Sequence, residues 1–118
     1  MPIKTEEGKT PNGHLCMRAL VSGHVSLADA EAMSAQLRKG QHFHGVRVLC
    51  LVEKSTEYSA EARKHFGSMH GNYLRMATVV TSAFLRASIN FMTRLFGHRE
   101  DFRLFNTEAE AQAWLDQA

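Results

Sequence analysis

The chain has 118 residues, of which 44% are hydrophobic and 22% are charged, with a formal net charge of +2. This length fits a single domain that buries about two thirds of the surface exposed by its unfolded chain. No apolar run approaches the roughly 20 residues that cross a bilayer, and the polar opening lacks the apolar middle of a secretory signal. We therefore expect a cytoplasmic protein without a transmembrane segment.

Charge and cysteine content argue against two further classes of protein. The 14 Lys and Arg residues and the 12 Asp and Glu residues are divided equally between the two halves of the chain. Nucleic-acid-binding domains instead concentrate basic residues on one face. Cys16 and Cys50 fall within apolar stretches, where free thiols are usually small buried hydrophobic groups. We expect no nucleic-acid partner and two free thiols.

The first two predicted elements form a hairpin. Ile3–Lys9 is expected to be a short edge strand, and Asn12-Gly13 marks a turn because both residues tolerate the positive φ angles of tight hairpins. Leu15–Val21 is the second strand, with alternate side chains on opposite faces, and Gly23 ends it. Residues 1–13, the edge strand and its turn, are the part of the domain that is free to be flexible.

A helix and a central strand follow. Ser26 and Asp29 match a capping box, in which the hydroxyl accepts from the third helical amide and the carboxylate accepts from the amide of the cap. The first helix is expected to start there and to stop at Gly40. Val46–Glu53 is almost continuously apolar, which is typical of a strand covered on both faces in a largely parallel sheet.

The rest of the chain repeats this alternation. The expected elements are a second helix capped by Ser59, a strand over Arg75–Thr81, a third helix from Thr81-Ser82 to about Phe96, a strand over Asp101–Phe105 and a final helix capped by Thr107. The order is β-β-α-β-α-β-α-β-α. We predict a single α/β domain over residues 1–118, with a mixed, mostly parallel sheet, the N-terminal hairpin at one edge and about four helices.

The chain ends in FRLFNTEAEAQAWLDQA, a Phe-rich strand (Phe102–Phe105) followed by an acidic, Ala-rich helix that carries Trp-Leu (Glu108–Leu115). Gly23–Asp29 adds a glycine before a capped helix, and Met76–Val80 adds a central strand. Together these stretches resemble the STAS superfamily, specifically its small SpoIIAA-like bacterial branch. The resemblance covers about residues 14–118 and depends on packing and capping signals.

This resemblance implies a STAS/SpoIIAA-like fold and a non-enzymatic regulatory or binding domain. Anti-sigma-factor antagonists of this type bind a partner kinase, and related folds of the CRAL-TRIO type enclose lipids. Phospho-regulated antagonists carry an Asp-Ser-Ser-Gly type motif at a helix start, whereas the equivalent stretch here, Glu53–Ser59, holds hydroxyls without that motif. Ser55 and Ser59 are the candidate phosphorylation sites, with plain helix capping as the alternative.

The predicted third helix has more apolar surface than one core contact requires. At about 100° per residue its apolar positions span roughly 200°, against about 100° for a one-sided surface helix. Such a surface needs a cover, which is a loop of the same chain, a second subunit or a ligand. In a homodimer the same helix would lie on both sides of a two-fold axis. The candidate partner or ligand surface comprises Phe84, Leu85, Ile89, Phe91, Met92 and Phe96.

Motifs for metal binding and catalysis are missing from the sequence. His42 and His44 have the most suggestive spacing among the seven histidines, but a metal site needs a third and usually a fourth ligand in fixed geometry. Neither a Gly-x-Ser-x-Gly elbow nor a phosphate-binding glycine loop occurs. Tyr58, Tyr73 and Arg75 could line a polar cleft at the strand ends, with ordinary surface placement as the alternative. We expect no metal, no cofactor and no enzymatic activity.

These observations favour one function and leave a second open. The first is a cytoplasmic, homodimeric STAS-like domain that acts through surface recognition of a protein partner. The second is a carrier or sensor of a small apolar ligand or lipid, with the third helix as a wall of its pocket.

Overall fold

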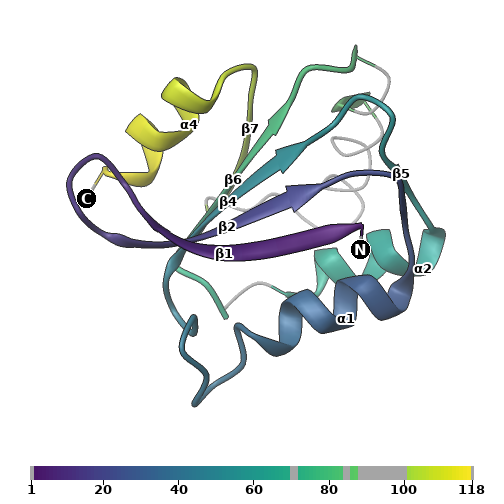
Figure 1. Cartoon of the computed structure of the whole chain (residues 1–118), viewed down its shortest axis with the longest axis horizontal. Helices are drawn as coiled ribbons and strands as arrows, with labels where there is room; N and C mark the ends of the chain where they lie inside the picture. The colour runs from purple at the N-terminus through teal and green to yellow at the C-terminus, as the bar shows by residue number, and fades with distance from the viewer. Residues whose placement is uncertain (1, 70–71, 84–85, 88–100, 118) are drawn as a thin grey trace.

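The computed structural model describes residues 2–69, 72–83, 86–87 and 101–117, which form a five-stranded sheet with helices on both faces (Figure 1). The strands are β1 (Ile3–Lys9), β2 (Leu15–Val21), β4 (Arg47–Val52), β6 (Arg75–Val80) and β7 (Phe102–Phe105), in the order β1-β2-β4-β6-β7. β1 and β2 are antiparallel, and the other neighbours are parallel. The predicted mixed, mostly parallel sheet with the N-terminal hairpin at one edge is confirmed.

Helices α1 (Leu27–Ala35) and α2 (Ala60–Gly67) lie on one face of the sheet, and α4 (Glu108–Leu115) lies on the other (Figure 1). About four helices were expected, and these three have described bounds. Ala83, Arg86 and Ala87 are helical as well, while the remainder of the expected third helix lies outside the described residues. None of the helices in the described ranges combines the length and apolar character needed to cross a membrane.

Side-chain caps start these helices where the sequence predicts them. The Ser26 hydroxyl accepts from the Asp29 amide at 3.3 Å, and the Asp29 carboxylate accepts from the Ser26 amide at 2.9 Å. This reciprocal pair is the predicted capping box. The hydroxyls of Ser59 and Thr107 likewise cap α2 and α4 by accepting from a backbone amide three residues on.

Two local features differ from the sequence prediction. α1 ends at Ala35, earlier than Gly40, because the amides of Gln36 and Leu37 donate to carbonyls only three residues back and tighten the chain into turns. In addition, β3 (His24–Val25) and β5 (Glu57–Tyr58) form a separate parallel two-stranded sheet. Strands of two residues carry no period that a sequence pattern could reveal.

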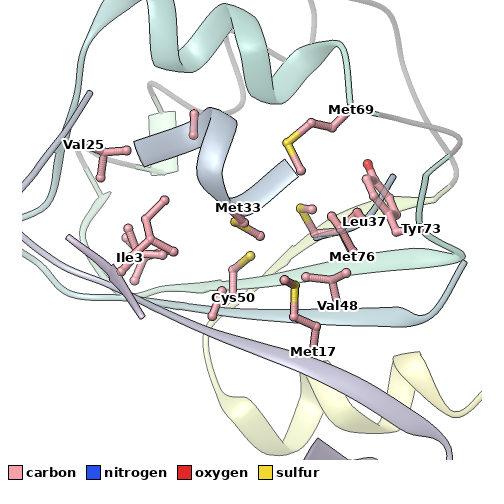
Figure 2. Packing of buried hydrophobic residues seen from close by; sticks show 14 of the residues in the cluster. Ile3, Met17, Val25, Met33, Leu37, Val48, Cys50, Met69, Tyr73 and Met76 are labelled. Atoms are coloured by element: carbon pink, nitrogen blue, oxygen red, sulfur yellow. The ribbon is translucent and has the colours of Figure 1, made fainter. Parts of the chain in front are cut away.

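The central strands are apolar on both faces because both faces are covered. Toward α1 and α2, Met17, Met76 and Cys50 from the strands pack with Met33 and Met69 from the helical layer (Figure 2). The smaller core toward α4 consists of Cys16, Leu49, Ala77, Ala111, Trp114 and Leu115. The two cysteines therefore lie on opposite faces of the sheet, and both are free thiols.

Candidate binding surface

An apolar row crosses the sheet near the carboxyl ends of its central strands. Leu20 of β2 is paired with Leu51 of β4, and Leu51 is paired with Val79 of β6, so the three side chains lie side by side on the α4 face. All three are only partly buried. They form the floor of a hollow of about 260 Å³, which is also lined by Val21, Ser22, Val52, Glu53 and Thr81.

The row is left partly open because α4 is short and is anchored at the other end of the strands. Arg47 and Arg75, the first residues of β4 and β6, donate to the carbonyls of Leu115 and Trp114 at the end of α4. A helix of eight residues is about 12 Å long, whereas a strand of six residues spans about 20 Å. α4 therefore covers only part of this face.

The hollow combines an apolar floor with a polar rim. Ser22, Glu53 and Thr81 each follow directly after their strand, at the carboxyl ends where open α/β sheets usually bind ligands. Among the described residues that line the hollow are one carboxylate and two hydroxyls. Such a lining can bind an apolar group and orient a polar one.

The residues predicted to form the partner or ligand surface lie outside the described residues. They are Phe84, Leu85, Ile89, Phe91, Met92 and Phe96. Thr81, at which the sequence predicts this helix to start, is described and is part of the rim of the hollow. The Arg86 amide donates to the Ser82 carbonyl in the first helical turn, and the Arg86 guanidinium donates to Asn106 at 2.8 Å. The described part of this helix begins where the sequence predicts it.

Ser55 and Ser59 flank the short strand β5. Ser55 is exposed in a turn closed by the hydrogen bond from the Thr56 amide to the Glu53 carbonyl. Ser59 is half-buried, and its hydroxyl accepts from the Ala62 amide at 3.1 Å. The capping role of Ser59 is confirmed, and phosphorylation of either serine stays a prediction.

The three residues considered for a polar cleft do not converge, so that interpretation is wrong. Tyr73 is buried in the larger core. Tyr58 packs edge-on against Phe66, with ring centroids 5.8 Å apart, and its burial raises the pKa of its hydroxyl. Arg75 instead lies against Trp114 on the α4 face. The two tyrosines pack with the core on the α1 and α2 side, whereas Arg75 points to the α4 side, and the sequence alone does not show this separation.

The two histidines with metal-like spacing point at different partners. His42 Nε2 lies 2.7 Å from the Glu7 carboxylate, and His44 Nδ1 lies 2.8 Å from the Leu37 carbonyl oxygen. Within the part of the chain that the structure describes, no group of three or more His, Cys, Asp or Glu side chains is arranged to hold a metal ion.

The apolar row was not among the residues singled out from the sequence. A usable signal was nevertheless present, because the final helix spans only eight residues while several strands carry apolar side chains on the face it covers. Some of those side chains must remain uncovered by α4. Which ones they are depends on the register between strands, which the sequence does not show.

A solved structure with the same fold is known. The crystal structure of an uncharacterised DUF3478-family protein from Shewanella loihica PV-4, described as having a SpoIIAA-like fold, has a TM-score of 0.65 and 16% sequence identity, over 96% of this chain and 93% of that chain. This likeness confirms the predicted STAS/SpoIIAA-like fold and concerns the fold alone. No curated protein matches the sequence. Residues 11–118 match the model of the family described as Domain of unknown function (DUF7793), and the chain belongs to that family.

Proposed function

We propose that the protein is a cytoplasmic, non-enzymatic interaction domain that works as a homodimer and binds a protein partner at the carboxyl ends of its central strands. The observation that supports this most is the in-register row of Leu20, Leu51 and Val79 on the floor of the hollow. Thr81 of the rim also precedes, along the chain, the segment whose sequence is apolar over a broad helical arc.

The physical reason is the cost of apolar surface in water. Burying such surface contributes about 25 cal/mol per Å², and contiguous apolar patches with a polar rim mark contact sites on soluble proteins. Ser22, Glu53 and Thr81 form such a rim. A partner side chain placed over the row would leave water, while the rim carboxylate and hydroxyls would pair with the partner's polar groups.

Photo-cross-linking in cells tests this binding surface. A benzoylphenylalanine at Thr81, an exposed rim position, is expected to form an adduct with a discrete protein on irradiation. Leu20→Asp in the same chain should abolish that adduct, because it charges the floor of the hollow. Leu74, which is 50% exposed and lies outside the lining of the hollow, is the matched control position and should give no adduct. An absence of protein adducts from Thr81 would contradict the proposal.

A carrier or sensor of a small apolar ligand or lipid is the second candidate. The apolar floor of the hollow favours it, although its volume of about 260 Å³ is smaller than the roughly 300–1,000 Å³ of small-molecule sites. In that case a lipid-sized molecule should copurify with the wild type and be lost from Leu51→Asp. The control Leu74→Asp should retain the molecule.

A further inference from the structure

Among the described residues, no strand pairs with the outer edge of β1. β1 is the first strand in the sheet order, and its register with β2 is unbroken. Antiparallel neighbours alternate between pairs that exchange hydrogen bonds and pairs that do not. The Ser22 amide donates to the Pro2 carbonyl, and the Thr10 amide donates to the His14 carbonyl, so the even-numbered residues of β1 bond to β2. The backbone groups that point away from β2 are those of Ile3, Thr5, Glu7 and Lys9.

A second hollow lies beside this edge. It has a volume of about 500 Å³ and is bounded by β1 and α1. Its lining comprises Ile3, Lys4 and Thr5 from β1 and Asp29, Ala32, Met33 and Gln36 from the α1 side. A sheet edge beside a helix-walled groove is a geometry in which proteins accept an additional strand.

The charges of β1 decide which registers of a second β1 strand are possible. In a two-fold antiparallel pair, a register centred on Lys4, Glu6 or Glu7 would set that residue directly opposite its own copy, and like charges facing each other are unfavourable. A register centred on Gly8 would overlap only Glu7–Lys9. Charged edge strands normally oppose edge-to-edge pairing. Here the like charges disfavour the registers centred on Lys4, Glu6 and Glu7, and the short overlap disfavours the register centred on Gly8.

The register centred on Thr5 has complementary charges. It sets Lys4 of each copy opposite Glu6 of the other, and it pairs the outward backbone groups of Ile3 with those of Glu7. Both Lys4 and Glu6 are exposed. Arg18 lies 3.4 Å from the Glu6 carboxylate and holds it at the strand.

We propose that two copies of the chain join by antiparallel pairing of their β1 strands, with Thr5 on the two-fold axis. The two five-stranded sheets then form one continuous sheet, and each hollow beside α1 receives side chains from the β1 strand of the other copy. This inference rests on the proposed function, which includes a homodimer, and it specifies the surface through which the two copies contact each other. The hollow over Leu20, Leu51 and Val79 stays open for the protein partner.

Sedimentation velocity of the full chain tests the role of the backbone edge. The wild type should sediment as a dimer at micromolar concentration. Thr5→Pro removes the outward amide at the axis while leaving the bonds to β2, and proline is tolerated on edge strands. We expect it to raise the dimer Kd at least about tenfold. Thr5→Val loses the same hydroxyl bond to Gln36 but keeps the amide, so this control should remain dimeric.

The charge pairs have their own test. Lys4→Glu sets like charges opposite each other and should also raise the dimer Kd at least about tenfold. Lys9→Glu is the same change on the same strand outside the proposed overlap, and it should leave the dimer unchanged. Combining Lys4→Glu with Glu6→Lys restores opposite charges and should recover dimerisation. Equal effects of Lys4→Glu and Lys9→Glu would overturn the register.

The outcomes separate this interface from the proposed function. If the wild type is still a monomer at a protein concentration of about 100 µM, both the β1 interface and the homodimer are overturned. The partner surface at Thr81 is not affected by that result. If Thr5→Pro and Lys4→Glu still form the dimer but Phe91→Asp does not, the dimer contact involves the third helix. That result would overturn the β1 interface but not the homodimer. The backbone amide of Thr5 should exchange its hydrogen more slowly in the dimer than in the monomer, because pairing would hydrogen-bond it.

Discussion

Arg75 binds Trp114 in two ways at once. Its Nη1 donates to the Trp114 carbonyl at 2.8 Å, and its guanidinium carbon lies 5.2 Å from the centre of the indole ring. Arg103 approaches the same ring at 5.3 Å. The last carbonyls of a helix lack partners within the helix and carry a partial negative charge. Because the last turn of α4 contains no basic residue, arginines from the neighbouring strands supply the positive charge.

Replacing Arg75 should therefore destabilise the α4 layer. Arg75→Lys is expected to lower the free energy of unfolding by about 1–2 kcal/mol, because lysine lacks the planar group that stacks and donates together. Arg103→Lys loses a ring contact and should cost about 0.5–1 kcal/mol. Urea unfolding measures both. An Arg75→Lys variant as stable as the wild type would contradict the anchoring role.

The capping box of α1 predicts a pH dependence. Hydrogen bonds from the Ser26 amide and hydroxyl lower the pKa of Asp29. Since the folded-state pKa lies below the unfolded one, the charged carboxylate stabilises the fold above the unfolded pKa of about 3.9 and ceases to do so as pH falls through the lower folded value.

The variants Asp29→Asn and Ser26→Ala distinguish the contribution of the Asp29 charge to stability from that of the Ser26 helix cap. Asp29→Asn should cost stability at pH 6, and the difference from wild type should shrink below about pH 4. Ser26→Ala should cost about 1 kcal/mol through the lost cap. Urea unfolding across this pH range is the measurement, and a cost of Asp29→Asn that is independent of pH would count against the bonds from Ser26.

The two thiols are predicted to be unreactive in the native protein. Burial raises the pKa of Cys50 to about 12 and also raises that of Cys16, so at pH 8 almost no thiolate is present. Alkylation by iodoacetamide should be at least about a hundredfold slower in the native state than in urea. Intact mass over time gives the rates. Rapid native modification, or a mass showing a disulfide, would contradict the burial of both thiols.

The two candidate phosphorylation sites differ in what they do for the fold. Ser59→Ala should cost about 1 kcal/mol because it removes the α2 cap, while Ser55→Ala should change stability by less than about 0.5 kcal/mol. Ser59→Asp keeps a capping oxygen and should be close to wild type. Thermal unfolding gives these values, and peptide mass spectrometry of protein from cells shows whether Ser55 or Ser59 carries phosphate.

Elements specified by local chemistry could be predicted from the sequence. Val46–Glu53 was recognisable as a strand covered on both faces because its apolar run has no polar alternation, and the structure places β4 at Arg47–Val52. Ser26, Ser59 and Thr107 were recognisable as caps because each capping hydroxyl acts within three residues of itself. Helix starts and strand positions followed from such short-range signals.

Features that depend on contacts between distant residues could not be predicted. Leu20, Leu51 and Val79 form a row only because three strands pair in one register. The β3–β5 pair forms because Glu57 and Ser59 donate backbone hydrogen bonds to Gly23 and Val25, which no local pattern encodes. The residues of the candidate site were therefore not predicted, although its rim residue Thr81 was named as the start of the third helix.

Native mass spectrometry of protein purified from cells tests the central claim most directly. A homodimeric interaction domain should appear at twice the mass of the 118-residue chain, without a bound small molecule, and Leu74→Asp should give the same spectrum. A single chain that retains a lipid-sized adduct would contradict the interaction domain and would identify the protein as a carrier.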